Sequence, residues 1–235
     1  MSVTKIDNPI CVAIDTPDLG RADALARTLS SHVGMLKVGM EFFYAHGRDG
    51  YCRLARQGIP VFLDLKLHDI PNTVAAGLGS LMQLDPKPAI INVHATGGPG
   101  MLAAAARAID GRAKLIAVTI LTSLDSKDLS ACGFDRTLST DEHAVNLALM
   151  AKANGIDGVV CSPHDLTGIR QACGDDFLTV VPGIRPEGSD AQDQKRIATP
   201  ASAISDGADI LVIGRAITGA DDPAKAARTI LQSLS

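Results

Sequence analysis

The sequence is poor in aromatic residues and has no strong excess of charge. Its 235 residues include no tryptophan, two tyrosines and five phenylalanines, and 22 lysines and arginines stand against 26 aspartates and glutamates, a formal net charge of −4. Surfaces that bind nucleic acids usually combine excess positive charge with aromatic rings on which bases stack. We therefore expect no nucleic acid partner. With 46% apolar and 20% charged residues, the chain can fill a large globular core.

Long hydrophobic runs are also missing. The longest uncharged stretch, 88–106, is interrupted by histidine, glycine and proline, so no transmembrane helix is expected. The N-terminus reaches Lys5 and Asp7 early and offers no apolar segment of the kind that a secretion signal needs. The five cysteines are never closer than 12 positions, which fits neither a disulfide framework nor a Cys-x-x-Cys zinc site. We expect a cytoplasmic protein with reduced thiols. The six histidines are scattered and predict no metal site, and His94 is interpreted as a hydrogen-bonded residue of the fold.

Short apolar runs recur along the chain and indicate strands. There are eight, at 11–15, 35–39, 61–67, 89–95, 115–121, 158–162, 178–184 and 210–215. The spacing between them leaves room for helices, which parallel strands need as crossover connections. Eight strand–helix units in 235 residues predict a closed (β/α)8 barrel, a TIM barrel, as a single domain over 1–235. An open doubly wound sheet is the competing architecture, because periodicity cannot show ring closure.

The segments between the runs carry helix signals and two unusual connections. Ser139 and Glu142 have the spacing of a capping box, and Asp222 precedes a proline at a predicted helix start. The connections 122–141 and 185–196 are long and polar, and both follow the carboxyl ends of predicted strands. Because that end of a (β/α)8 barrel carries the active site, both connections are candidate lids, although surface insertions without a role would look similar.

Charged residues gather at the ends of the first three predicted strands. Side chains alternate along a strand, so Asp64 and Lys66 share one face of the third run while its leucines share the other. Asp15 ends the first run and Lys37 lies inward on the second, so these charges point toward one end of the barrel, with Asp69 just beyond. A structural network of ion pairs is the alternative. Because buried ion pairs rarely stabilise a fold better than apolar residues do, a catalytic role is preferred.

Glycine stands beside arginine at the ends of the seventh and eighth predicted strands. These residues are Gly183 with Arg185, and Gly214 with Arg215. Backbone N–H groups and guanidinium donors could converge there on one anion, at the end of the barrel that commonly binds phosphate. Turn glycines beside solvated arginines are the alternative.

The stretch DLKLHDIPNTV at 64–74 closely resembles the signature of the orotidine 5′-phosphate decarboxylase family, with its Asp-x-Lys-x-x-Asp core. Further segments match in the same order, and they are VAID, LKVG, INVHATGG, the Leu-Thr-Ser after the fifth run, PGIRPEG, DQKR and IGR. The resemblance runs nearly end to end. It implies a barrel enzyme of pyrimidine biosynthesis that converts orotidine 5′-monophosphate to UMP and CO2 without a cofactor or metal.

The resemblance also implies roles for individual residues. Asp64 and Lys66 match the family's catalytic aspartate and lysine, and Lys37 matches the lysine that links Asp64 to the ribose. Asp69 and Thr73 match residues that the family supplies to the active site of the neighbouring subunit, which implies a homodimer.

The remaining matches concern substrate binding. Asp15 would bind ribose hydroxyls, and Thr122 falls in the loop that holds the pyrimidine. The residues that match the phosphate side are Arg185, Gln194, Gly214 and Arg215, with Gln194 also reaching the base and Arg185 belonging to the lid.

Two other functions share part of this pattern. A Mg²⁺-dependent 3-keto-L-gulonate 6-phosphate decarboxylase has the same signature, but it carries a metal-binding glutamate where this chain has Lys37, whose ammonium would repel the ion. A non-catalytic nucleotide-binding barrel would need only the phosphate-binding residues. The intact Asp64, Lys66 and Asp69 indicate that the chemistry is retained.

Overall fold

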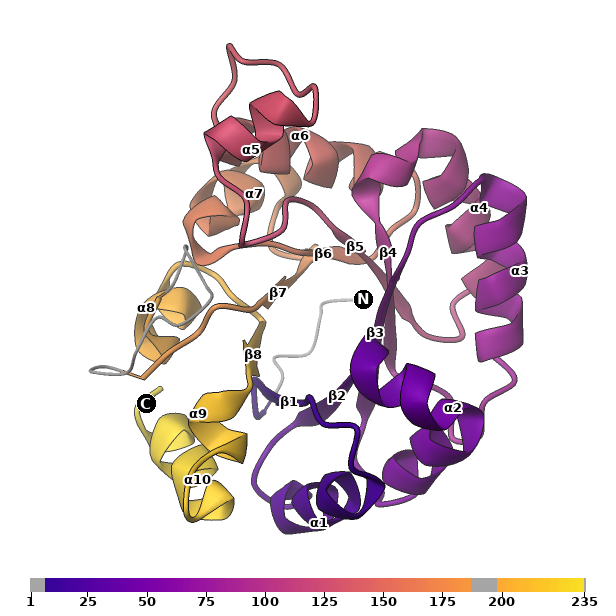
Figure 1. Ribbon diagram of the computed structural model, residues 1–235. Helices are drawn as coiled ribbons and strands as arrows, with labels where there is room; N and C mark the ends of the chain where they lie inside the picture. The colour runs from indigo at the N-terminus through magenta and orange to yellow at the C-terminus, as the bar shows by residue number, and fades with distance from the viewer. Residues whose placement is uncertain (1–6, 187–197, 235) are drawn as a thin grey trace.

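The computed structural model, which describes residues 7–186 and 198–234, contains a closed barrel of eight parallel strands (Figure 1). The strands pair in chain order, and β1 bonds to β8 to close the ring. They are β1 (Ile10–Ile14), β2 (Met35–Gly39), β3 (Val61–Leu67), β4 (Ile90–His94), β5 (Lys114–Val118), β6 (Gly158–Val160), β7 (Leu178–Val181) and β8 (Ile210–Ile213). The predicted barrel is confirmed, and the open doubly wound sheet is excluded.

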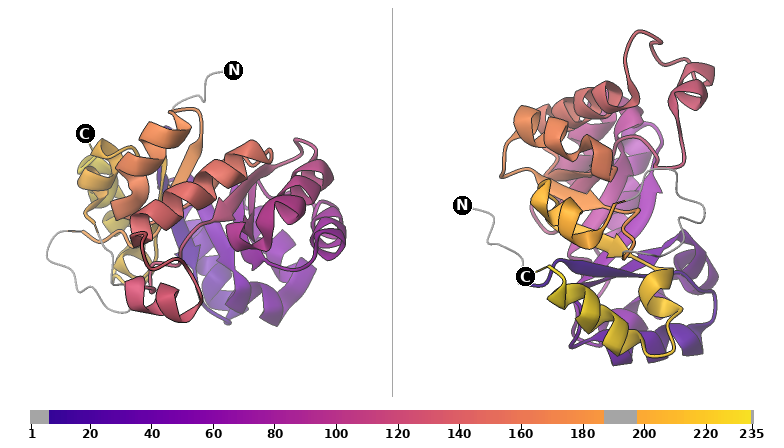
Figure 2. Two further views of the ribbon diagram at one scale, coloured as in Figure 1. Left: turned by 90° about the horizontal axis from the view of Figure 1, so that it is seen from above. Right: turned by 90° about the vertical axis from the view of Figure 1, so that its left-hand side faces the viewer.

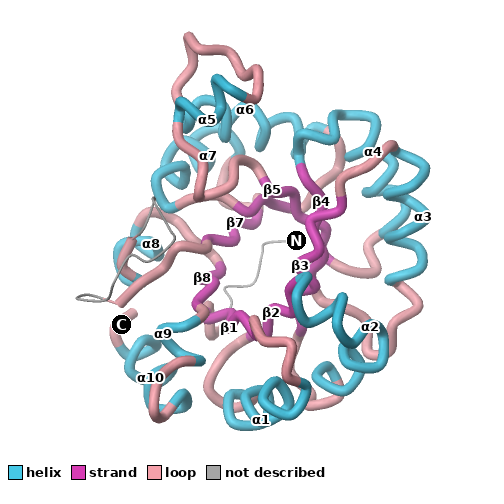
Figure 3. Tube along the Cα trace, viewed as in Figure 1, coloured by secondary structure: helices cyan, strands magenta, loops and turns pink. Residues whose placement is uncertain are grey.

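Helices surround this ring on the outside (Figure 3). They are α1 (Leu19–Leu29), α2 (Met40–Ala55), α3 (Pro71–Leu81), α4 (Gly98–Ile109), α5 (Ser126–Ala131), α6 (Thr140–Ala153), α7 (Leu166–Cys173), α8 (Pro200–Ser205), α9 (Arg215–Thr218) and α10 (Pro223–Gln232), with short 3-10 helices η1 (Ala95–Gly97) and η2 (Pro163–Asp165). Ser139 and Glu142 form the predicted capping box of α6, and Asp222 caps α10 as expected. None of the described helices is long and apolar enough to cross a bilayer.

The apolar core has two layers, because each strand sends alternate side chains to opposite faces. One buried cluster fills the barrel and includes Phe62, Ile116 and Val180. A larger cluster, which includes Leu63 and Leu65, packs between the strands and the helices. The alternation predicted for β3 is therefore confirmed, and it places the polar residues of that strand on the inner face.

Of the two long connections, the structure describes the first in full and the second only at its start. The segment 122–141 contains α5, and Leu129 of this helix packs with Ile120 and Ala144 in a small apolar cluster of its own. Figure 2 shows α5 projecting at one end of the barrel. The predicted lid at 185–196 lies outside the described residues apart from its first two positions.

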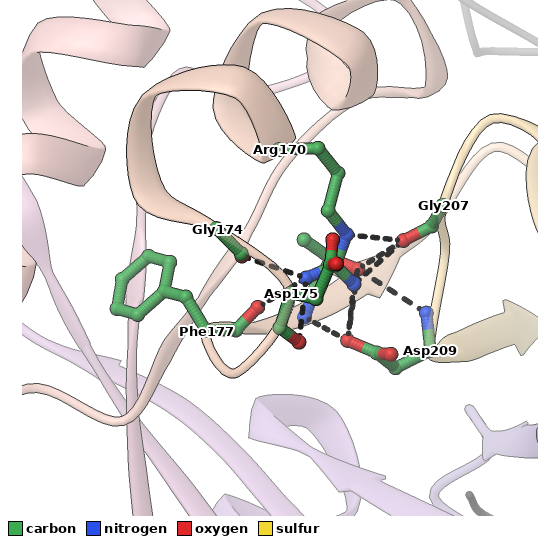
Figure 4. Close-up of polar contacts among 7 residues, drawn as sticks. Arg170, Gly174, Asp175, Phe177, Gly207 and Asp209 are labelled. Atoms are coloured by element: carbon green, nitrogen blue, oxygen red, sulfur yellow. Dashed lines mark hydrogen bonds and ion pairs between the residues drawn. The ribbon is translucent and has the colours of Figure 1, made fainter. Parts of the chain in front are cut away.

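A partly buried network joins the amino-terminal ends of β7 and β8 (Figure 4). Arg170 of α7 donates from Nη1 to the Phe177 carbonyl at 2.7 Å and from Nη2 to Asp209 Oδ2 at 2.5 Å. Its Nε also donates to the Gly207 carbonyl at 2.8 Å. The same Asp209 oxygen accepts from the Thr179 amide at 2.8 Å. One guanidinium thus ties together the segments that lead into two adjacent strands, at the end of the barrel opposite to the strand carboxyl ends.

Candidate active site

A cavity of about 500 Å³ opens at the carboxyl ends of the strands, where the sequence places its charged residues. Eight of the predicted site residues line it, and they are Asp15, Lys37, Asp64, Lys66, Thr122, Arg185, Gly214 and Arg215. Asp69 and Thr73 do not line this cavity, and Gln194 lies outside the described residues. The fold thus brings together side chains that are up to 200 positions apart in the sequence.

Four side chains from β2, β3 and the loop after β1 form a row of alternating charge, which we call the charge row: Asp15, Lys37, Asp64 and Lys66. Lys37 Nζ donates to Asp15 Oδ1 at 3.1 Å and lies 3.3 Å from Asp64 Oδ2. The other oxygen of that carboxylate, Oδ1, accepts from Lys66 Nζ at 2.7 Å. Asp64 and Lys37 are nearly buried, whereas the Lys66 side chain is 28% exposed to the cavity. Lys66 is therefore held from the inner side with its ammonium within reach of a ligand.

The charge row keeps its two buried members, Lys37 and Asp64, ionised. Burial alone would raise the pKa of Asp64, but the charges of Lys37 and Lys66 and hydrogen bonds from Lys66 and Asn92 hold this pKa below its ordinary value. Burial likewise works to lower the pKa of Lys37, but the charges of Asp64 and Asp15 outweigh it and raise the pKa. At neutral pH, Asp64 therefore presents an anion between two ammonium groups.

Two residues that support the charge row were missed in the sequence analysis. Asn92 of β4 is wholly buried and donates from Nδ2 to Asp64 Oδ1 at 2.7 Å. Its signal was available, because a buried amide inside the apolar run at 89–95 must find hydrogen-bond partners. Gly39 is the other: a Cβ at this position would lie 3.2 Å from Lys37 Nζ and 3.3 Å from Asp15 Oδ1. Glycine leaves the room in which this ion pair forms.

Arginine and glycine line the other side of the cavity, as predicted for an anion site. Gly183 has a φ of +78°, a conformation that favours glycine, and it lets the chain turn after β7 into the buried Arg185. The Arg185 guanidinium donates to the Ile184 carbonyl at 3.1 Å. Gly214 and Arg215 follow β8 directly, and Arg215 begins α9. The cavity therefore has a cationic side at β7 and β8, separate from the charge row at β1 to β3.

Apolar side chains form much of the wall between these two sides. Phe62, Val118, Ile120, Val160 and Val212 all line the cavity. A wall of this kind lowers the local dielectric constant, and charges that face a bound ligand there interact more strongly than they would in water.

The β3–α3 connection places Asp69 and Thr73 on the surface. Both are exposed, and the Asp69 carboxylate accepts from the backbone amide of Ile70 at 2.6 Å. Ile70, between them, is 67% exposed although it is apolar. Within one chain, the charge row has no contribution from Asp69, so the predicted role of this residue depends on a neighbouring subunit.

His94 is hydrogen-bonded, as predicted: its Nδ1 lies 2.8 Å from Thr96 Oγ1. Burial, with the nearby charges of His68 and Lys66, lowers the pKa of His94 to about 4, so the ring is neutral at pH 7. Across residues 7–186 and 198–234, no three His, Cys, Asp or Glu side chains are grouped as metal ligands would be.

Taken together, the barrel, the charge row and the arginine side define a class: (β/α)8-barrel enzymes that act on small phosphorylated substrates with lysine and aspartate side chains. The model of the orotidine 5′-phosphate decarboxylase / HUMPS family matches residues 8–230. The chain belongs to this family.

Individual relatives agree with this assignment. The chain is 50% identical over 228 residues to orotidine 5′-phosphate decarboxylase of Sphingopyxis alaskensis, covering 97% of this chain and 99% of that protein. It is 48% identical over 229 residues to the protein of the same name from Erythrobacter litoralis, covering 97% and 100%. Among solved structures, orotidine 5′-phosphate decarboxylase from Lactobacillus acidophilus superposes with a TM-score of 0.85 at 38% identity, covering 97% of this chain and all of that one.

Proposed function

We propose that this chain catalyses the decarboxylation of orotidine 5′-monophosphate to UMP and CO2, a step of pyrimidine biosynthesis. The observation that carries the proposal is the Lys66 ammonium, which is bound to Asp64 at 2.7 Å and faces a cavity large enough for a nucleotide. Family membership and relatives of that name, 46–50% identical to this chain, support the same activity.

The chemistry assigned to Lys66 follows from the charge that the reaction develops. When the bond between C6 and the carboxylate breaks, CO2 leaves and the electron pair stays on C6 of the pyrimidine. An ammonium fixed beside C6 stabilises this carbanion and then delivers one proton to it, which yields UMP and a neutral amine that regains a proton from water. Because Lys66 is positioned before substrate binds, the transition state gains its electrostatic stabilisation without the cost of reorganising solvent. Asp64 binds the Lys66 ammonium at 2.7 Å and is itself held by Lys37 at 3.3 Å, so the amine is kept in place, and the proposed reaction uses no cofactor and no metal.

The cationic side of the cavity would bind the phosphate, which takes no part in the bond changes. Arg215 and the backbone of Gly214 are the assigned contacts, with Arg185 beside them and Gln194 reaching both phosphate and base. Asp15 would bind the ribose, and Thr122 the pyrimidine. Contacts far from C6 raise the rate when their binding energy closes the site and excludes water from the charge row.

The second element of the proposal is a homodimer in which Asp69 and Thr73 complete the active site of the partner. Its support is the exposure of both residues, together with the exposed apolar Ile70 between them. Mixing subunits that carry Asp69→Ala with subunits that carry Lys66→Ala tests it. If Asp69 acts across the interface, one site in each mixed dimer is intact, and random mixing restores about a quarter of the wild-type activity. No recovery would mean that Asp69 acts within its own chain.

We also place the protein in the cytoplasm. None of the five cysteines, all of them described by the structure, forms a disulfide, and four of them are buried, which is typical of a reducing compartment.

The test of the activity is UMP formation from orotidine 5′-monophosphate, followed as the fall in pyrimidine absorbance. Activity that persists in EDTA separates this function from the Mg²⁺-dependent 3-keto-L-gulonate 6-phosphate decarboxylase, which Lys37 already disfavours: its ammonium lies 3.3 Å from Asp64. A purified protein that binds UMP but forms none from orotidine 5′-monophosphate would instead be the non-catalytic nucleotide-binding barrel.

A further inference from the structure

We propose that Asn92 is a positioning residue that aims the Lys66 ammonium by holding both the backbone of this lysine and the carboxylate to which the ammonium is bound. The proposal rests on the proposed decarboxylase function and assigns Asn92 a role in it. Asn92 does not line the cavity, so it would act through Lys66 and Asp64 rather than on the substrate.

The need for such a residue arises from an irregularity in the sheet. Between β3 and β4, Leu63 pairs with Ile91 but Leu67 pairs with Val93, so β3 uses four steps where β4 uses two. The two extra residues of β3 interrupt the regular ladder of backbone hydrogen bonds. Lys66 lies inside this bulge, and its φ of +51° is in the left-handed region that residues other than glycine rarely adopt. The lysine therefore has an unfavourable backbone conformation that its surroundings must maintain.

The Asn92 side chain supplies the partner that the ladder does not. Its Oδ1 accepts from the Lys66 backbone N–H at 2.7 Å, while its Nδ2 donates to Asp64 Oδ1 at 2.7 Å. The orientation of the amide is determined by these partners, because the reversed amide would put NH2 against an N–H and oxygen against a carboxylate. Since Asn92 is 0% exposed, water cannot readily replace either contact.

These bonds close a ring around a single lysine. Asp64 Oδ1 accepts both from Asn92 and from Lys66 Nζ, which also lies at 2.7 Å. One amide thus constrains Lys66 at its main chain directly and at its ammonium through Asp64. Asn92 therefore fixes the backbone of Lys66 and the carboxylate that binds its ammonium at the same time, which is what a positioning role requires.

The chain offers a matched control. Thr119 is also 0% exposed, and it follows β5 at the same end of the barrel, where its hydroxyl donates to the Val160 carbonyl at 3.0 Å. Its hydroxyl is bonded to this carbonyl and not to the charge row, and Thr119 does not line the cavity. Thr119→Val removes one buried hydrogen bond, as a purely structural loss at Asn92 would.

The experiment compares Asn92→Ser, Asn92→Asp and Thr119→Val with the wild type for kcat and KM on orotidine 5′-monophosphate, for the pH profile of kcat and for UMP binding. Serine is too short to span both partners. We expect its kcat to fall on the order of 100-fold, as for a displaced reacting group, with UMP affinity nearly unchanged.

Aspartate at position 92 keeps the acceptor for the Lys66 N–H but loses the donor to Asp64 and adds a like charge. We expect it to lower kcat and to move the acidic limb of the pH profile upward, because the pKa of Asp64 rises. Thr119→Val should keep the wild-type kcat and pH profile.

The outcomes separate the two proposals. If the wild type forms no UMP, the proposed function fails. If the wild type is active and Asn92→Ser keeps kcat within about threefold, or loses only substrate affinity, Asn92 has no positioning role. Should the serine variant not fold, the nearly isosteric Asn92→Asp decides alone: an unshifted acidic limb and an unchanged kcat would overturn the inference.

Discussion

Removing the attraction between Lys37 and Asp64 should cost far more stability than removing a surface ion pair of similar length. The perturbation is a double-mutant cycle of Lys37→Met, Asp64→Asn and the combined variant, with unfolding by urea near pH 7 as the assay. The matched control is the pair Lys114–Asp157. Its N–O distance of 2.8 Å is shorter than the 3.3 Å of Lys37–Asp64, but its side chains are 61% and 32% exposed against 11% and 10%.

The magnitude follows from distance and burial. Two unit charges 3.3 Å apart attract by about 5 kcal/mol at an effective dielectric constant near 20 and by about 1 kcal/mol in water. Lys66 still neutralises Asp64 when Lys37 is removed, so the coupling should be smaller than the first figure. We expect about 2–3 kcal/mol for Lys37–Asp64, and less than about 1 kcal/mol for the control.

The pH dependence of this coupling has a definite sign. The pKa of Asp64 is lowered by folding, so its stabilisation is complete above the ordinary value of 3.8 and is lost as the pH falls through the folded pKa. The pKa of Lys37 is raised, so its stabilisation is complete below the ordinary value of 10.5 and is lost as the pH rises through the folded pKa. The coupling should therefore be constant around pH 7 and vanish in strong acid. A coupling no larger than that of Lys114–Asp157, or one that grows in acid, would refute this reasoning.

Three further substitutions test other parts of the structure. Arg215→Ala should lower kcat/KM for orotidine 5′-monophosphate by at least about 100-fold, since a charge-assisted contact is lost, but leave the slow reaction of orotidine unchanged; equal losses would exclude a phosphate contact. Gly39→Ala should push Lys37 away from Asp15 and reduce kcat/KM with little change in urea stability, whereas a variant with wild-type kinetics would show that the close approach is unimportant. Arg170→Met should lower the free energy of unfolding by about 3 kcal/mol, because the carbonyls of Phe177 and Gly207 and the carboxylate of Asp209 lose their donor. An unchanged urea midpoint would contradict a stabilising role for the network at β7 and β8.

Much of the fold could be predicted because the spacing of the apolar residues indicates where the strands lie and which of their side chains face inward. The alternation in β3 placed Asp64 and Lys66 on the inner face, and the structure confirms this arrangement. Ring closure could not be predicted from periodicity alone, because it depends on the pairing of β1 with β8, whose residues are about 200 positions apart.

The site was predicted less completely, and the gaps have physical causes. Charged residues at strand ends could be recognised as site candidates because burying a charge is costly and is seldom found without a function. Asn92, in contrast, is uncharged and lies in a run that otherwise fits a strand. The left-handed backbone at Lys66 could not be foreseen either, since it results from a bulge in the register between β3 and β4. Gly39 was missed because its importance is the space it leaves beside Lys37, which no local pattern encodes.

The most direct measurement is the turnover of Lys66→Ala with orotidine 5′-monophosphate, alongside its affinity for UMP. Electrostatic stabilisation at C6 and delivery of the proton are lost together in this variant, so we predict that kcat falls by at least about 10⁴-fold while UMP still binds. A turnover within tenfold of the wild type would contradict the assignment of the reaction to this ammonium.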